Sequence, residues 1–318
     1  MLEKDAIDND AIEIIRPTKI ENKNLHSLDD KYIEVSEMTN EEREFLSAVI
    51  LRNKPHKLLE LGVSRGGSSI VMLNAIKDMQ DTKLYSIDLN EMWYRTREVK
   101  TGYYVNNYPE LKRKWELFTG GLALKFMDQI GNDIDLCLID TVHSNPGEIF
   151  DYLMVLPYLK DNAIVILHDT KYHCSIMTQA GITNNLLMSS IYGKKYIQGN
   201  YISGTSYGFP NIGGIKLNAE TKRHIFEVFN LLTIKWSYQP NDTQKADIIN
   251  YFSRFYNEEY IEYLRNVFTF QHNLNQNYSI RLLPMYKNVI KATIKKILGK
   301  KIVEKIKAYR GREGRHGI

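Results

Sequence analysis

The chain has 318 residues, 43% hydrophobic and 25% charged, and no apolar run approaches the roughly 18 residues of a membrane-spanning helix. Two cysteines without zinc-ligand spacing exclude a disulfide framework. Because the acidic N-terminus also lacks a signal pattern, we expect a cytoplasmic protein. Residues 287–315 carry 11 basic and two acidic side chains, a local charge of +9, whereas the whole chain has a net charge of +4. The rest of the chain therefore has a charge of −5, which excludes nucleic-acid binding by the body of the protein.

The distribution of apolar residues predicts the elements in chain order. Residues 1–45 form a surface-lying arm and then a short helix that starts near Thr39, whose hydroxyl can cap it. Short apolar runs separated by helix-length segments follow, and they predict buried parallel strands with helical crossovers. These runs are 57–63, 83–89, 115–120, 134–142, 163–170, 196–202 and 211–218. We expect a doubly wound, mostly parallel seven-stranded α/β sheet over 46–218, and a helical extension over 219–285.

A glycine-containing turn joins the first predicted strand to the following helix. Gly62 and Gly66 allow a sharp turn and close approach of a nucleotide, and Ser68 can cap the helix; Ser64 stands where a strict G-x-G-x-x-G motif would have glycine. Glu60 and Asp88 end the first two strands, where carboxylates can accept hydrogen bonds from a ligand, Asp88 from both ribose hydroxyls. Taken singly, Glu60 is equally consistent with a solvated loop acid, and Asp88 with a helix cap.

This order of residues resembles the class I S-adenosylmethionine-dependent methyltransferases. The resemblance implies that Glu60, Gly62, Ser64 and Gly66 hold the methionine part of the donor and that Asp88 holds its ribose; Ser68 is a further candidate for cofactor binding. Thr119, Gly120 and Gly121 fall where that family contacts adenine. An NAD-dependent oxidoreductase acting on a nucleotide sugar shares the glycine turn and the ribose acid, and is the alternative from another class.

Polar residues also end the fourth and fifth predicted strands. Asp140 and His143 follow the fourth strand, and His168 and Asp169 follow the fifth. Because the carboxyl ends of both strands face the same crevice, these side chains are expected to converge there. Two carboxylates and two imidazoles at one place indicate metal binding or acid–base chemistry.

These strand ends resemble the metal-dependent O-methyltransferases of the catechol, caffeoyl-CoA and macrolide-sugar branches, and a cephalosporin hydroxylase-like group. The resemblance implies that Asp140 and Asp169 bind Mg²⁺ or another divalent cation, with Thr170 in the place of a ligating Asn. His143 replaces a catalytic Lys and, if it titrates near neutrality, is a candidate base; His168 is a further candidate ligand. Alternatively, His143 itself ligates the metal and no protein base is used.

The segment after the fifth strand is expected to line the acceptor pocket. Lys171, Tyr172 and His173 follow Thr170 at once, and Tyr201, Tyr207 and Phe209 are further candidates. From the resemblance we expect an S-adenosylmethionine-dependent, metal-assisted O-methyltransferase acting on a hydroxyl of a sugar or glycan precursor. A catechol-like or other small-molecule acceptor is the nearest alternative.

The basic tail, residues 286–318, contains an amphipathic pattern over 286–310. Isoleucines and leucines recur there at helical spacing, with lysines on the other face. Such a helix can rest on an anionic membrane surface, which would place the protein at the inner membrane face. The alternatives are packing on its own domain or on a second copy of the chain in a homo-oligomer.

Overall fold

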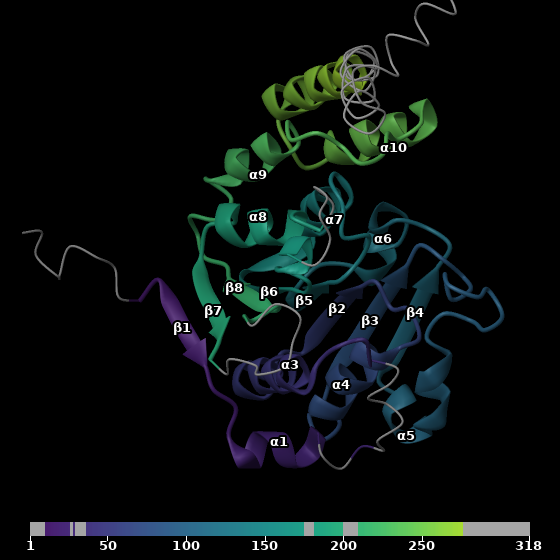
Figure 1. Cartoon of the computed structure of the whole chain (residues 1–318), viewed down its shortest axis with the longest axis vertical. Helices are drawn as coiled ribbons and strands as arrows, with labels where there is room; N and C mark the ends of the chain where they lie inside the picture. The colour runs from purple at the N-terminus through teal and green to yellow at the C-terminus, as the bar shows by residue number, and fades with distance from the viewer. Residues whose placement is uncertain (1–9, 26–27, 29–35, 175–180, 200–208, 276–318) are drawn as a thin grey trace, which may run out of the picture. The chain divides into compact units, whose positions relative to one another are not determined.

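The computed structural model describes residues 10–25, 28, 36–174, 181–199 and 209–275 (Figure 1). The chain forms two compact units, 1–267 and 268–318, and the sheet belongs to the first. The second unit is described only at 268–275, which are helical. The basic tail lies outside the described residues, so its membrane contact stays a prediction. Among the described helices, none is long and apolar enough to cross a membrane.

The core of the first unit is a sheet of eight strands. They are β1 (Ile12–Ile15), β2 (Lys57–Leu61), β3 (Lys83–Asp88), β4 (Trp115–Thr119), β5 (Ile134–Ile139), β6 (Leu159–Leu167), β7 (Lys194–Gln198) and β8 (Gly213–Lys216). Their order is β1-β7-β8-β6-β5-β2-β3-β4, and all neighbours are parallel except that β8 runs antiparallel to β6 and β7. The seven predicted strands are therefore confirmed in a Rossmann-like sheet.

The helices cover the sheet in two groups. The α-helices are α1 (Lys19–Leu25), α3 (Asn40–Asn53), α4 (Gly67–Ala75), α5 (Pro109–Lys112), α6 (Met127–Ile130), α7 (Gly147–Val155), α8 (Thr183–Ser190), α9 (Ile225–Leu231) and α10 (Asp242–Phe252). Short 3₁₀ turns are η2 (Tyr103–Asn107), η3 (Ala123–Lys125), η4 (Leu156–Tyr158) and η5 (Tyr172–Cys174). Figure 1 shows α3, α4 and α5 on one side of the sheet, and α6, α7 and α8 on the other.

The eighth strand comes from the N-terminal arm. Ile12–Ile15 pair in parallel with β7, so the described part of the arm extends the sheet instead of only lying on its surface. Ile15 is buried, and Arg52 of α3 binds both Glu21 of α1 and the carbonyl of Arg16. The predicted start of the next helix is confirmed, because Thr39 and Glu42 form a reciprocal capping box at the start of α3.

The strand order places a topological switch point between β2 and β5. From β2 the chain proceeds through β3 to β4 on one side, and then returns to β5 and β6 on the other. In such sheets the loops at the two strand ends diverge and leave a crevice where ligands bind. Residues that follow β2, β3, β5 and β6 therefore meet at one place.

Candidate active site

A cavity of about 1370 Å³ opens at the carboxyl ends of β2, β3, β5 and β6. Ten of the predicted site residues line it: Gly62, Ser64, Ser68, Asp88, Gly121, Asp140, His143, His168, Asp169 and Tyr172. Seven do not: Glu60, Gly66, Thr119, Gly120, Thr170, Lys171 and His173. The structure thus brings both predicted ends of the site, the glycine turn and the aspartate pair, into one space.

The backbone that follows the neighbouring strand β5 requires glycine at position 62. A Cβ on Gly62 would lie 1.8 Å from the carbonyl oxygen of Asp140, and the residue has φ of +86°. Glycine is therefore required for the turns after β2 and β5 to pass each other. Gly66, also in the left-handed region, is the N-cap residue of α4, and no side chain caps that helix, so the prediction that Ser68 caps it is wrong.

Glu60 lies behind the turn, not in the cavity. Its buried carboxyl accepts hydrogen bonds from Ser68 at 2.5 Å and from Ser69 and Ser86 at 2.6 Å. Burial raises the pKa of Glu60 to about 7, although these three hydroxyls lower it. The structure therefore corrects two expectations for Glu60, namely that it contacts the methyl donor directly and that it is a solvated loop acid. Instead, Glu60 fixes the turn from inside the core.

Asp88 closes the same turn from the cavity side. Its Oδ2 accepts hydrogen bonds from the backbone N–H groups of Val63 at 2.9 Å and Ser64 at 3.1 Å, and its Oδ1 accepts from Asn90. A carboxylate held by three backbone donors has a fixed orientation. Because Asp88 also lines the cavity, ribose binding remains a prediction that its position permits.

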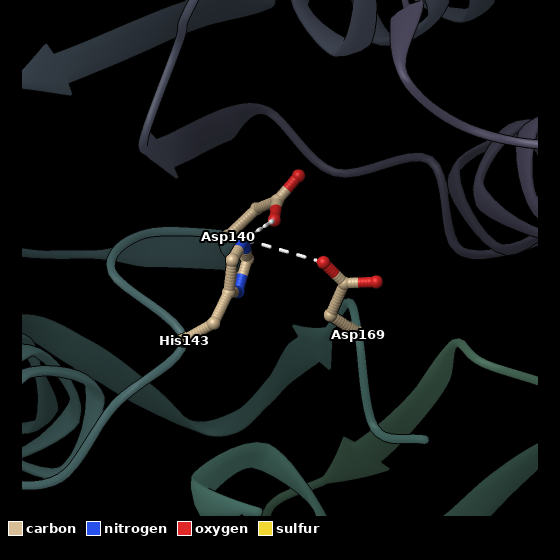
Figure 2. Close-up of side chains that lie close together, drawn as sticks. All are labelled: Asp140, His143 and Asp169. Carbon is tan, nitrogen blue, oxygen red and sulfur yellow. Dashed lines mark ion pairs between the residues drawn. The ribbon is translucent and has the colours of Figure 1, made fainter. Parts of the chain in front are cut away.

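Three side chains converge at the ends of β5 and β6 (Figure 2). Asp140, His143 and Asp169 each offer a ligand atom, and these atoms lie within 4.8 Å of one another. His143 Nε2 is 3.2 Å from Asp169 Oδ2 and 3.7 Å from Asp140 Oδ1. His143 and Asp169 have φ of 50° and 55°, in the left-handed region that Asp and His adopt more readily than most residues.

The other ring nitrogen of His143 is held by Glu148, a residue that sequence reasoning missed. His143 Nδ1 is 3.2 Å from Glu148 Oε1, and this buried carboxyl also accepts from Asn184 at 2.8 Å. Burial lowers the pKa of His143, but the Glu148 hydrogen bond and the charges of Asp140 and Asp169 outweigh it and raise the pKa to about 9. Without a bound cation, the pKa of His143 thus lies above the neutral range that its predicted role as a base requires.

His168 lies behind the cluster, buried between two carboxyl groups. Its Nδ1 is 3.1 Å from Asp140 Oδ1, and its Nε2 is 3.4 Å from Oε2 of Glu42, which belongs to α3. Burial lowers the pKa of His168, but Asp140 and Asp169 outweigh it, so the pKa is raised well above its ordinary value. Both ring nitrogens of His168 face carboxyl groups, and its ligand atoms are not among those that converge with His143, so the structure does not place His168 in the cluster as the sequence predicted.

Asn211, another residue missed from the sequence, orients Asp169. Its Nδ2 donates to Asp169 Oδ1 at 2.6 Å, its Oδ1 accepts from the backbone of Lys171, and it lines the cavity. Thr170 is buried outside the cavity, and its N–H donates to the Asn211 carbonyl. The amide near Asp169 thus comes from the segment before β8, and the prediction of Thr170 as a ligand is corrected.

Of the residues predicted to line the acceptor pocket, some line the cavity and others do not. Tyr172 lines the cavity with its ring 5.3 Å from that of His143. Lys171 lies outside the cavity, over the ring of Phe209, which is itself half exposed and does not line the cavity; His173 lies outside it too. These three positions correct the predicted pocket. Tyr201 and Tyr207 lie outside the described residues.

Comparison with known proteins agrees with this architecture. A family model described as "Methyltransferase domain" matches residues 59–170, about a third of the chain. This match covers the glycine turn, Asp88 and the aspartate pair. Residues 59–170 are thus similar to a methyltransferase domain, and the sheet that contains them is Rossmann-like.

Solved structures of similar architecture include a protein from Klebsiella pneumoniae provisionally named an O-methyltransferase, with 16% identity, a TM-score of 0.45, and coverage of 62% of this chain and 94% of that one. A Staphylococcus aureus protein, provisionally named a caffeoyl-CoA O-methyltransferase, has 16% identity, a TM-score of 0.45, and coverage of 63% and 97%. A Bacillus cereus O-methyltransferase in complex with SAH has 13% identity, a TM-score of 0.42, and coverage of 64% and 92%. Likeness at this level says nothing of the reaction. The search of curated proteins found no significant relative.

Proposed function

We propose that the protein is an S-adenosylmethionine-dependent O-methyltransferase, assisted by a divalent cation, that methylates a hydroxyl group of a sugar or glycan precursor. The observation that carries this proposal is the convergence of Asp140, His143 and Asp169 in the same cavity as the glycine turn and Asp88. One end of the cavity suits a nucleoside, and the other suits the activation of an oxygen nucleophile.

The electrostatics of the cavity suit a positively charged donor. Several carboxyl side chains line it, namely Glu37, Glu42, Asp88, Asp140, Asp151 and Asp169, against the cations Arg95, His143 and His168. An excess of carboxylates raises the local concentration of a cation such as a sulfonium. Gly62 and Ser64 would position the donor from the turn, and Asp88 would bind its ribose.

The donor set at the far end suits a divalent cation. Two carboxylates and one imidazole would hold it, with Glu148 fixing the His143 ring through its other nitrogen. Oxygen ligands suit Mg²⁺ or Mn²⁺, whereas an imidazole favours Mn²⁺ or Fe²⁺ over Mg²⁺. When bound, such an ion would lower the pKa of a coordinated hydroxyl. Asp140 and Asp169 would orient the acceptor oxygen toward the methyl group.

The acceptor is proposed to be a sugar because its vicinal hydroxyls can bind one cation together. Tyr172 presents a ring beside His143, and Asn211 presents an amide at the same wall. A sugar ring uses both kinds of group, one for stacking on its apolar face and one for hydrogen bonding. A catechol also chelates through two oxygens, so it is the second acceptor to be tested.

Calorimetry with S-adenosylmethionine, SAH and NAD⁺, each with and without Mn²⁺, tests the donor. We expect the first two to bind and NAD⁺ not to; binding of NAD⁺ alone would contradict the proposal. Asp140→Asn and Asp169→Asn should abolish methyl transfer while SAH still binds, and Asp161→Asn, an exposed acid paired with Lys222, is the matched control. Unchanged methyl transfer in both Asp140→Asn and Asp169→Asn would show that these two residues do not bind a catalytic metal ion.

Mass spectrometry of cell-surface glycans, with and without the gene, tests the acceptor. We expect the deletion to remove the mass of one CH₂ group from a glycan. Unchanged glycans, together with methylation of catechols by the purified protein, would favour the small-molecule acceptor.

A further inference from the structure

His168 is buried between Glu42 and Asp140, and the proposed metal cluster gives it no role. Its residue is 4% exposed, and that of Glu42 is 3% exposed. The ring nitrogen Nδ1 is 3.1 Å from Asp140 Oδ1, and Nε2 is 3.4 Å from Glu42 Oε2. Away from bulk water, removing one partner of such a pair leaves the other uncompensated, so these contacts cost more to break than pairs at the surface.

Glu42 is held in place by the start of helix α3. Its Oε2 accepts the backbone N–H of Thr39 at 2.7 Å, and its own N–H donates to the Thr39 hydroxyl at 3.3 Å. The oxygen that caps the helix is therefore the same oxygen that faces His168. Phe45 and Leu46 of α3 are fully buried, so the helix fixes this carboxyl relative to the core.

The other two proposed metal ligands are each oriented by a polar residue from a different segment, namely His143 by Glu148 and Asp169 by Asn211. His168 stands in the same relation to Asp140, because its Nδ1 faces the Asp140 carboxyl. The imidazole can orient that carboxyl only if its own ring is fixed, and Glu42 faces the second ring nitrogen. Metal affinity depends on such outer partners, since they hold the ligands in the geometry that the ion requires.

We infer that Glu42 and His168 act together as positioning residues that hold the Asp140 carboxylate for the divalent cation, and so connect the start of α3 to the metal end of the cavity. This inference rests on the proposed function, because it assumes that Asp140 binds a cation. The sequence alone does not indicate the role of Glu42. Thr39 and Glu42 fit the S/T-x-x-E capping pattern, which by itself accounts for an acid at this position.

Calorimetry of the full-length protein with Mn²⁺, and separately with SAH, tests the inference. Glutamine also forms a capping box, so Glu42→Gln keeps the helix start and removes the charge that faces His168. We expect this variant to bind Mn²⁺ about 10-fold more weakly than the wild type and to bind SAH equally well. Glu41→Gln, in the same first turn of α3 but outside the cavity, is the matched control and should keep both affinities.

A double-substitution cycle tests whether Glu42 acts through His168. His168→Gln alone should also weaken Mn²⁺ binding by about 10-fold. Adding Glu42→Gln to His168→Gln should weaken it no further, because the connection to Asp140 is already broken. Two losses that multiply in the double variant would show that Glu42 acts independently of His168, and would overturn the inference.

The outcomes separate this inference from the proposed function. If the wild-type protein does not bind Mn²⁺, the proposed metal role is wrong and the inference fails with it. If the wild type binds Mn²⁺ and Glu42→Gln binds it equally well, only the positioning role is overturned. A parallel loss of SAH binding would also overturn it, since Glu42 would then shape the whole cavity. If Glu42→Gln does not fold, unchanged Mn²⁺ affinity in His168→Gln contradicts the same role.

Discussion

Replacing Glu60 with glutamine tests the buried turn after β2 through the pH dependence of stability. Burial raises the pKa of Glu60 from 4.5 to about 7, so between these values the folded protein holds a proton that the unfolded chain releases. The stability linked to this proton is fully present below pH 4.5 and is lost as the pH rises to about 7. At about 1.4 kcal/mol per pKa unit, the loss is about 3 kcal/mol.

Glutamine has no titrating proton, so the variant should lack this loss. We expect the free energy of unfolding of Glu60→Gln, minus that of the wild type, to rise by about 3 kcal/mol between about pH 4.5 and 7.5. Urea unfolding at a series of pH values measures it. Glu258→Gln, an exposed acid paired with Arg265, is the control and should give a flat difference. A flat difference for Glu60→Gln as well would refute the assignment of a protonated, buried Glu60.

Two further substitutions test the strand ends. Gly62→Ala should destabilise the protein by more than about 3 kcal/mol in urea unfolding, because a Cβ meets the backbone after β5. Gly131→Ala, also at positive φ but with only the end of the Lys57 side chain nearby, should cost less, about 1–3 kcal/mol of backbone strain. Equal costs would show that φ alone requires glycine at position 62. Glu148→Gln should weaken Mn²⁺ binding about 10-fold in calorimetry because it loosens His143, whereas Glu227→Gln, at an exposed His–Glu pair, should not. Unchanged Mn²⁺ affinity in Glu148→Gln would contradict its positioning role.

The sheet could be predicted because its strands are buried on both faces and leave continuous apolar runs in the sequence. β1 could not, since it is four residues long and its isoleucines at positions 12 and 14 are about half exposed. Its pairing with β7 joins residues nearly two hundred positions apart, which no local pattern records. The division of the chain into an arm, a domain, an extension and a tail stays a prediction.

At the site, the chain order of strand ends was enough to predict that Asp140, His143 and Asp169 converge. The residues that orient them come from elsewhere: Glu148 from α7 and Asn211 from the segment before β8. Each is an ordinary polar residue in sequence, and only folding buries it beside a partner. The same cause explains Glu60, whose three serine partners are visible only in three dimensions.

The switch point between β2 and β5 gathers its surroundings from both ends of the chain. Glu42 precedes the segment 59–170 that matches the family model, and Asn211 and Tyr238 follow it, yet all three border the cavity. A fragment trimmed to the matched segment would keep the aspartate pair. It would lose Glu42, the carboxyl group paired with His168, and Asn211, which donates a hydrogen bond to Asp169. We therefore expect the smallest catalytically competent piece to be longer than residues 59–170 and to include the flanking segments on both sides.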